Sequence, residues 1–98
     1  MLIVAGELIV EAELREQFLR SREAVMRASR NEPGCVDYVF SADPLEPGRV
    51  VLFERWESQE ALDAHIAAMR ARPRTGEPEV ATLRAEVLRY EISAVGPL

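Results

Sequence analysis

The fold is decided by residues 50–69, which read VVLFERWESQEALDAHIAAM. The first seven residues are typical of a strand, and the residues after Ser58 repeat apolar side chains at helical spacing. Ser58 is a good N-cap residue for that helix. The stretch also holds the one Trp and the one His of the chain, Trp56 and His65. It therefore predicts a strand that runs directly into a helix.

The helix predicted after Ser58 ends near Pro73. Its core-facing stripe is expected to consist of Leu62, Ile66 and Met69. Residues 74–78 are predicted to form a loop, and Pro78 suits the first turn of a short helix over residues 79–83.

The rest of the chain supplies three more strands and one long helix. Residues 2–10 form an apolar, β-branched strand, and residues 11–29 repeat apolar side chains at helical spacing until a Glu-Pro-Gly turn. Residues 35–41 and 49–57 are strands joined by a turn rich in Pro and Gly, which is typical of an antiparallel hairpin. Residues 84–94 form the last strand.

The order of these elements is β-α-β-β-α-β. It predicts one α+β domain over residues 1–98 with the ferredoxin-like split βαβ arrangement, in which helices cover one face of a four-stranded antiparallel sheet. The strand over residues 2–10 is apolar on both faces, whereas a strand buried on one face alone should alternate with polar residues. We therefore expect a homodimer, a dimeric α+β barrel in which the two sheets face each other.

Composition narrows the class of protein. The chain has 98 residues with 17 acids against 12 bases, and its net charge of −5 argues against nucleic acid as a partner. The apolar runs are far shorter than a membrane span, and the first residues lack the basic segment of a signal peptide. We expect a cytoplasmic protein with no membrane partner. The one cysteine, Cys35, allows no internal disulfide and is predicted to be a small core residue.

Three features resemble a known family: the Glu-Pro-Gly-Cys turn over residues 32–35, the hairpin, and the stretch FERWESQEALDAH over residues 53–65. Together they resemble antibiotic biosynthesis monooxygenase domains, and most closely the small quinol monooxygenases. The resemblance implies a dimeric α+β barrel with a pocket between sheet and helices in each subunit. It also implies oxygenation of phenolic or quinol-like substrates by dioxygen with no metal, flavin or other cofactor.

The resemblance suggests three functions. The first is a monooxygenase that acts on a small quinol-like or polyphenolic aromatic substrate. The alternative is a non-catalytic or non-oxidative small-molecule-binding dimer of the same fold. Haem degradation fits less well, because that branch resembles a set of Asn, Trp and His at positions that look like Glu7, His65 and roughly Thr75 here.

Five residues are candidates for the site, four of them aromatic or imidazole side chains. His65 is the candidate catalytic base, since histidine titrates near neutral pH and accepts the proton of a quinol or enol; a bland, partly buried helix residue is the alternative. Trp56 is a candidate to offer a flat wall to an aromatic substrate; the alternative, which we favour slightly, is a structural residue that plugs the corner between strand and helix. Tyr38 and Phe40 share a face with Val36 and are candidates to line the same cavity, or else are core or dimer contacts.

Glu7 and Glu54 each place an acid inside an apolar strand, where an unpaired charge is costly. Each acid lies at the sheet edge, pairs with an Arg across a strand, or sits in a cavity as a base with a raised pKa. We favour the ion pair for both. Either acid can face the pocket, and we include Glu54 among the substrate-binding candidates.

Overall fold

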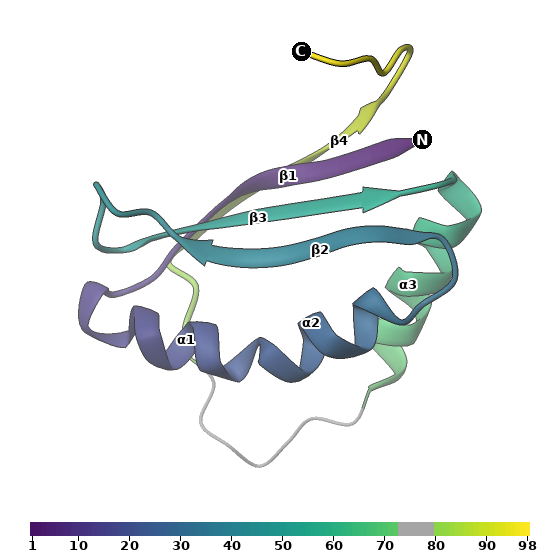
Figure 1. Ribbon diagram of the computed structural model, residues 1–98. Coiled ribbons are helices and arrows are strands. Elements are labelled where there is room, and N and C mark those ends of the chain that lie inside the picture. The colour runs from purple at the N-terminus through teal and green to yellow at the C-terminus, as the bar shows by residue number, and fades with distance from the viewer. Residues whose placement is uncertain (73–79) are drawn as a thin grey trace.

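In the computed structural model, residues 1–72 and 80–98 form four strands, three α-helices and one short 3-10 helix (Figure 1). The elements are β1 (Leu2–Ile9), η1 (Ala12–Leu14), α1 (Arg15–Ser21), α2 (Glu23–Arg30), β2 (Cys35–Ala42), β3 (Arg49–Trp56), α3 (Gln59–Ala71) and β4 (Arg84–Glu91). The order β-α-β-β-α-β is confirmed, with the first helix in two pieces.

The strands form one sheet in the order β2-β3-β1-β4, and every neighbouring pair is antiparallel. The helices α1 and α2 run along one side of this sheet, and α3 packs at the end where β3 finishes (Figure 1). This arrangement confirms the predicted ferredoxin-like α+β fold.

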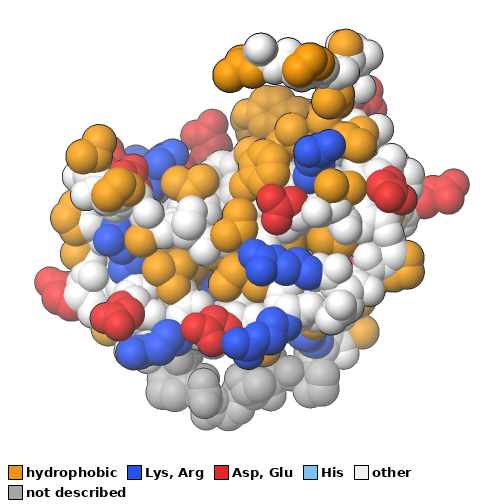
Figure 2. Space-filling model, viewed as in Figure 1, with side chains coloured by type: hydrophobic (Ala, Val, Ile, Leu, Met, Phe, Trp, Pro, Cys, Tyr) orange, Lys and Arg blue, Asp and Glu red, His pale blue; other side chains and the backbone are white. Residues whose placement is uncertain are grey.

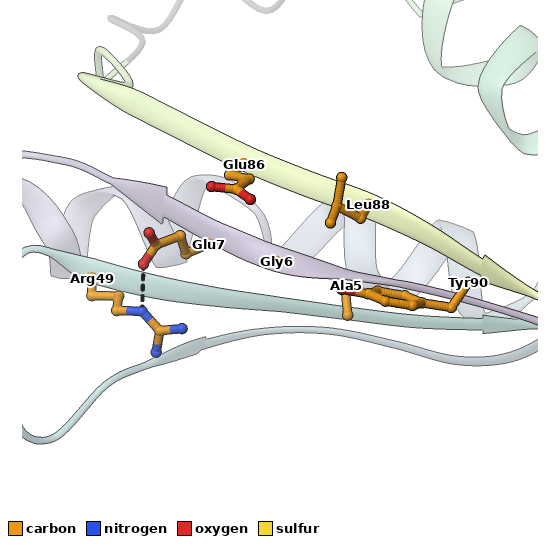
Figure 3. A pocket seen from close by; sticks show the side chains of 7 residues that line it. All are labelled: Ala5, Gly6, Glu7, Arg49, Glu86, Leu88 and Tyr90. Atoms are coloured by element: carbon orange, nitrogen blue, oxygen red, sulfur yellow. Dashed lines mark hydrogen bonds and ion pairs between the residues drawn. The ribbon is translucent and has the colours of Figure 1, made fainter.

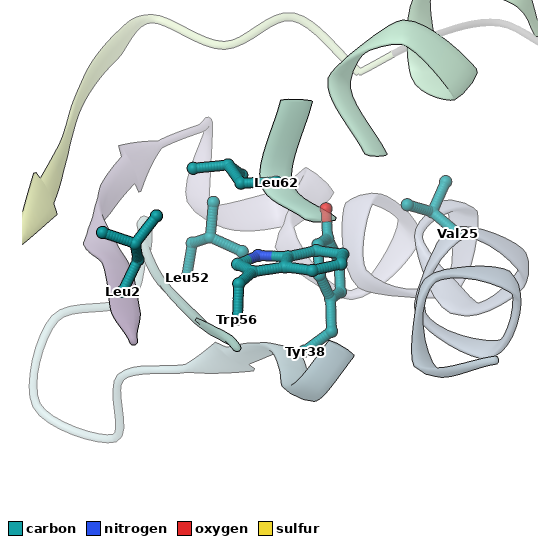
Figure 4. Close-up of a cluster of buried hydrophobic side chains, with 6 residues drawn as sticks. All are labelled: Leu2, Val25, Tyr38, Leu52, Trp56 and Leu62. Atoms are coloured by element: carbon teal, nitrogen blue, oxygen red, sulfur yellow. The ribbon is translucent and has the colours of Figure 1, made fainter. Parts of the chain in front are cut away.

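The core lies between the sheet and the helices, in two clusters. The first contains buried side chains from five elements, namely Leu2, Val25, Tyr38, Leu52, Trp56 and Leu62 (Figure 4). The second consists of Val10, Phe18, Val50 and Val80. Trp56 and Phe18 are the largest fully buried side chains, and burying an aromatic side chain of this size stabilises the fold by about 1.5–3 kcal/mol.

The two faces of the sheet differ in what covers them. Leu2, Val4 and Leu8 of β1 pack into the first cluster beneath the helices. The alternate residues point to the other face, which no helix within residues 1–72 and 80–98 covers (Figure 1). We call this surface the open face; its apolar members are Ile3, Ala5, Ile9, Val39, Val51, Phe53, Leu88 and Tyr90. Figure 2 shows hydrophobic side chains gathered over the strands and charged side chains along the helices.

The first helix differs from the prediction of one continuous helix over residues 11–29. It begins as a 3-10 turn and breaks at Arg22, between α1 and α2. Ser21 Oγ donates a hydrogen bond to the carbonyl of Phe18 at 2.6 Å, and such side-chain bonds to the preceding turn bend helices.

The start of β2 also differs from the prediction. Val36 was expected to share a face with Tyr38, but the register shifts between Cys35 and Asp37. This bulge places one extra residue in β2, so Val36 is exposed at 44% and Cys35 packs against the first core cluster. The prediction of Cys35 as a small core residue is confirmed.

The C-terminal segment is less regular than predicted. The last strand ends at Glu91 rather than at residue 94, because Glu91 pairs with Leu2 and β1 begins there. A helix over residues 79–83 is wrong for its described part, residues 80–83, since they contain no helix. Instead, Leu83 N donates to Ile9 O at 2.7 Å, which ties this segment to the sheet. Residue 79 and the predicted loop over residues 74–78 lie outside the described residues.

Candidate functional site

His65 lies in a buried group of polar and aromatic side chains under the helices. Its side chain is only 6% exposed. The imidazole ring lies 4.7 Å from the ring of Trp56 and 5.2 Å from that of Tyr38, centre to centre. The strands β2 and β3 supply these aromatic rings, and α3 supplies the histidine.

An acidic side chain faces each nitrogen of the imidazole. Nδ1 lies 3.0 Å from Oε1 of Glu32, and Nε2 lies 3.9 Å from Oε1 of Glu54. The indole Nε1 of Trp56 donates to the same Glu54 oxygen at 2.9 Å. We call Glu32, Tyr38, Glu54, Trp56 and His65 the His65 cluster.

The start of α3 determines which helix residues face this cluster. Ser58 is the N-cap, as predicted, because its Oγ accepts a hydrogen bond from Ala61 N at 3.1 Å. From this start, helical spacing turns Leu62 and His65 inward, and both are buried. The prediction of Ile66 in the core stripe was wrong, since Ile66 is exposed at 38% and His65 takes the inner position.

Burial changes the acidity of the cluster. It raises the pKa of Glu54 above its ordinary value, and the hydrogen bond from Trp56 and the nearby His65 oppose this rise. Burial also raises the pKa of Tyr38, to which Glu54 adds. The pKa of the Cys35 thiol is raised as well, chiefly by burial, which disfavours a nucleophilic thiolate. The acid–imidazole pair is therefore the part of the cluster best suited to proton transfer.

Phe40 lies next to the cluster rather than in it. Its ring packs edge-on against Tyr38, with 5.8 Å between ring centres, and against Phe18 at 6.0 Å. The guanidinium of Arg22 lies over both phenylalanine rings, 4.8 Å from Phe18 and 5.9 Å from Phe40. Phe40 thus extends the aromatic wall from Tyr38 towards α1.

Glu7 lies on the open face, away from His65. Arg49 Nε donates to its Oε2 at 2.6 Å, and Arg84 approaches Oε1 at 3.5 Å. The predicted ion pair is therefore confirmed for Glu7. For Glu54 it is wrong, because its side chain is buried and its described contacts are with Trp56 and His65 rather than with an arginine.

The open face also carries a hollow of about 260 Å³ (Figure 3). Its lining residues are Ala5, Gly6, Glu7, Arg49, Glu86, Leu88 and Tyr90. All belong to strands, and none belongs to the His65 cluster. The hollow is thus separate from the buried acids and the imidazole.

Residues 1–72 and 80–98 contain no group of three or more His, Cys, Asp or Glu placed to hold a metal ion. No helix in the described part of the chain is long and apolar enough to cross a membrane.

The sequence profile of antibiotic biosynthesis monooxygenases matches residues 1–72. These residues include every described helix and strand except β4. The chain belongs to the antibiotic biosynthesis monooxygenase family. An uncharacterized protein of Synechocystis sp. is 35% identical to this family member over 65 residues. That match covers 66% of this chain but only 44% of the relative, so the chain spans less than half of the relative's length.

Solved structures share the fold of this family member. A candidate antibiotic biosynthesis monooxygenase from Deinococcus radiodurans is 22% identical with a TM-score of 0.72, covering 100% of this chain and 98% of that protein. The haem degrader MhuD from Mycobacterium tuberculosis was solved with two haems in its active site. It is 19% identical with a TM-score of 0.72, and the match covers 99% of this chain and 100% of MhuD. Rv0793 from the same organism is 25% identical with a TM-score of 0.71, covering 98% of each chain.

The structure brings together four of the five predicted site residues, and it adds one that the sequence analysis missed. His65, Trp56, Tyr38 and Glu54 are in the cluster, with Phe40 beside Tyr38. Glu32 was missed because 33 positions separate it from His65, and no local spacing relates them. Its place directly before the Pro-Gly turn was the one available signal.

Proposed function

We propose that this chain is a cofactor-independent monooxygenase that acts with dioxygen on a small quinol-like or polyphenolic aromatic substrate. The buried imidazole of His65, with an acid facing each ring nitrogen and two aromatic rings beside it, gives this proposal its strongest support. Such a base is suited to take the proton of a phenol, and the rings are suited to pack against an aromatic substrate. Membership of the family supports the class of reaction.

In the proposed reaction, Nε2 of His65 accepts a phenolic proton, so that an O–H bond breaks and an N–H bond forms. The electron-rich phenolate then reduces dioxygen, and a C–O bond forms to a peroxide that takes the proton back. The carbon that carries the peroxide then loses its hydrogen as a proton, the C–H electron pair forms the carbonyl as the O–O bond breaks, and the released hydroxide takes up a proton and leaves as water. One oxygen atom enters the product, the other leaves as water, and the quinol supplies all four electrons.

The other predicted residues have supporting roles in this proposal. Trp56 and Tyr38 would form the walls of the site, and Phe40 would extend them. Glu54, whose pKa is raised by burial, would exchange a hydrogen bond with a hydroxyl of the substrate.

We further propose that the chain works as a homodimer whose open faces pack against each other. Leu88 and Tyr90 on that face are about half exposed, at 49% and 50%. Clustered apolar side chains that stay exposed on a sheet are costly to leave in water, and this cluster lies beside the Glu7–Arg49 ion pair. Packing two such faces together would bury these side chains and cover the hollow beside Glu7.

Oxygen uptake tests the enzyme proposal. We would compare metal-stripped wild type with His65→Gln on a panel of quinols and anthrones. Val50→Ala, a buried change in the second core cluster, controls for a general loss of stability. We expect uptake that survives chelation and falls about 10²–10⁴-fold in His65→Gln, the usual worth of a general base.

Other outcomes would contradict parts of the proposal. Unchanged uptake by His65→Gln would remove the base and keep the oxygenase. No uptake across the panel would overturn the oxygenase and favour the non-catalytic small-molecule-binding dimer, for which a thermal shift with the same compounds is the test. An absorbance band with added hemin would support haem binding instead. In the structure, however, Glu7 and His65 lie on opposite faces of the sheet, and Thr75 lies outside the described residues.

A further inference from the structure

The turn between α2 and β2 places Glu32 beside Nδ1 of the candidate base, His65. Gly34 has a positive φ of 81°, which favours glycine, and its carbonyl accepts a hydrogen bond from Glu57 N at 2.8 Å. A Cβ atom added at Gly34 would come within 2.5 Å of the Cβ of Ala61 in α3. The turn therefore packs directly on the first turns of α3, and Glu32 reaches His65, one helical turn beyond Ala61.

The contact determines which ring nitrogen carries hydrogen. The Nδ1 of His65 lies 3.0 Å from Oε1 of Glu32, which is a hydrogen-bond distance. A carboxylate only accepts hydrogen bonds, so Nδ1 is the donor when Glu32 is in its carboxylate form. In a neutral imidazole, Nε2 is then the acceptor.

We propose that Glu32 is a positioning residue that holds His65 in the Nδ1–H tautomer and thereby leaves Nε2 free to take a proton. The assignment of Nε2 as the atom that meets substrate rests on the proposed function. The tautomer itself does not, because it follows from the contact between Glu32 and His65.

The surroundings of Nε2 agree with this role. The 3.9 Å between Nε2 and Glu54 Oε1 is too long for a hydrogen bond, yet one hydroxyl oxygen can reach both atoms at once. Trp56 Nε1 donates to the same Glu54 oxygen and holds that side chain in place. A phenolic hydroxyl bound here would give its proton to Nε2, and Glu32 would stabilise the positive charge that develops on the ring.

Burial also distinguishes the two acids. The side chain of Glu32 is 24% exposed, whereas those of Glu54 and His65 are 7% and 6% exposed. A partly exposed carboxylate stays solvated and ionised at lower cost than a buried one. Glu32 is therefore the acid suited to orient the ring, and Glu54 is the one suited to exchange hydrogen bonds with a ligand.

The test reads the tautomer directly, by nitrogen NMR of protein labelled with ¹⁵N-histidine, which reports one residue because His65 is the one histidine. We expect wild type to show a protonated Nδ1 and an acceptor Nε2 in the neutral ring. Glu32→Gln should reduce the Nδ1–H population, because an amide can donate as well as accept. Glu32→Asp should restore it in part. Glu60→Gln, an exposed acid in the first turn of α3, is the matched control and should change nothing.

Activity supplies the second measurement. Glu32→Gln should lower kcat by about 10-fold or more with little change in KM, since positioning acts on the base and not on substrate binding. A neutral wild-type ring with hydrogen on Nε2, or a Glu32→Gln protein that keeps both tautomer and kcat, would overturn the proposal. If the expected tautomer is seen without any oxygen uptake, the positioning role stands and the oxygenase function fails. If Glu32→Gln does not fold, wild type and Glu32→Asp still decide the tautomer.

Discussion

Glu54 on β3 and Glu7 on β1 are acids in neighbouring apolar strands, but they point to opposite faces of the sheet. Glu54 lies under the helices, its side chain is 7% exposed, and it accepts a hydrogen bond from Trp56. Glu7 lies on the open face, where Arg49 donates to it at 2.6 Å. The covering layer explains the difference: water and arginine side chains reach the open face, whereas burial on the helix face favours a neutral acid.

The largest effect should come from truncating Trp56, on the face of the sheet that the helices cover. Trp56→Ala removes a fully buried ring and leaves Glu54 without its indole donor. We expect the free energy of unfolding to fall by about 3–5 kcal/mol, measured by urea denaturation. Phe53→Ala, an aromatic truncation on the open face of the same strand, is the control. Equal losses at low protein concentration would contradict the contrast between the faces.

The second-largest effect should come from a charge placed on the open face. Phe53→Arg places a charge amid Ala5, Val39 and Leu88, which the sheet register brings together. If two open faces pack together, a buried unpaired charge there should weaken the dimer by about 2 kcal/mol or more while each subunit stays folded. Sedimentation at several concentrations measures this. A wild type that is monomeric at micromolar concentration would remove the proposed dimer.

Replacing Glu54 by glutamine should change how the stability of the protein depends on pH. The folded protein holds the Glu54 proton more tightly than the unfolded chain, because burial raises the pKa above the ordinary 4.5. The stability that this proton contributes is therefore complete below about pH 4.5 and is lost as pH rises through the raised folded pKa. Glu54→Gln lacks this loss, so its unfolding free energy relative to wild type should rise with pH across that window.

Urea midpoints measured from about pH 4 to about pH 8 test the Glu54 prediction. Exposed Glu60→Gln is the control and should follow wild type. Parallel curves for wild type and Glu54→Gln would show that the buried carboxyl is not perturbed.

The smallest effect should come from the ion pairs of the open face. Arg49→Ala removes the partner of Glu7 and of Asp43, which it contacts at 2.6 and 3.0 Å. Its side chain is 30% exposed, so solvent screens both pairs and we expect a small loss of stability that shrinks further in high salt. Arg20→Ala, which breaks an exposed pair with Glu16 on α1, should cost still less. A loss as large as that of Trp56→Ala would contradict the screening of these two ion pairs by solvent.

Much of the fold followed from local patterns. The alternation and apolar content of the strands, the Ser58 cap and the hairpin turn are short-range signals, and the structure confirms each of them. The wrong predictions for β2 and α3 concern which residue of an element faces the core. Val36 lost its place on the core face to a bulge, and Ile66 lost its place in the core stripe to His65.

The sequence by itself determined the fold class and four residues of the His65 cluster, because residue type and spacing carry that information. Only the tertiary structure decided that Glu32 meets Nδ1 of His65 and that Glu54 and Glu7 differ in their surroundings. The contact of Glu32 with His65 joins elements far apart in the chain through the packing of α3 on the turn at Gly34, whereas the surroundings of Glu54 and Glu7 depend on the face of the sheet to which each points. An acid in a strand has the same local sequence pattern whether water, an arginine or an imidazole lies beside it. Only the folded chain determines which of these is its neighbour.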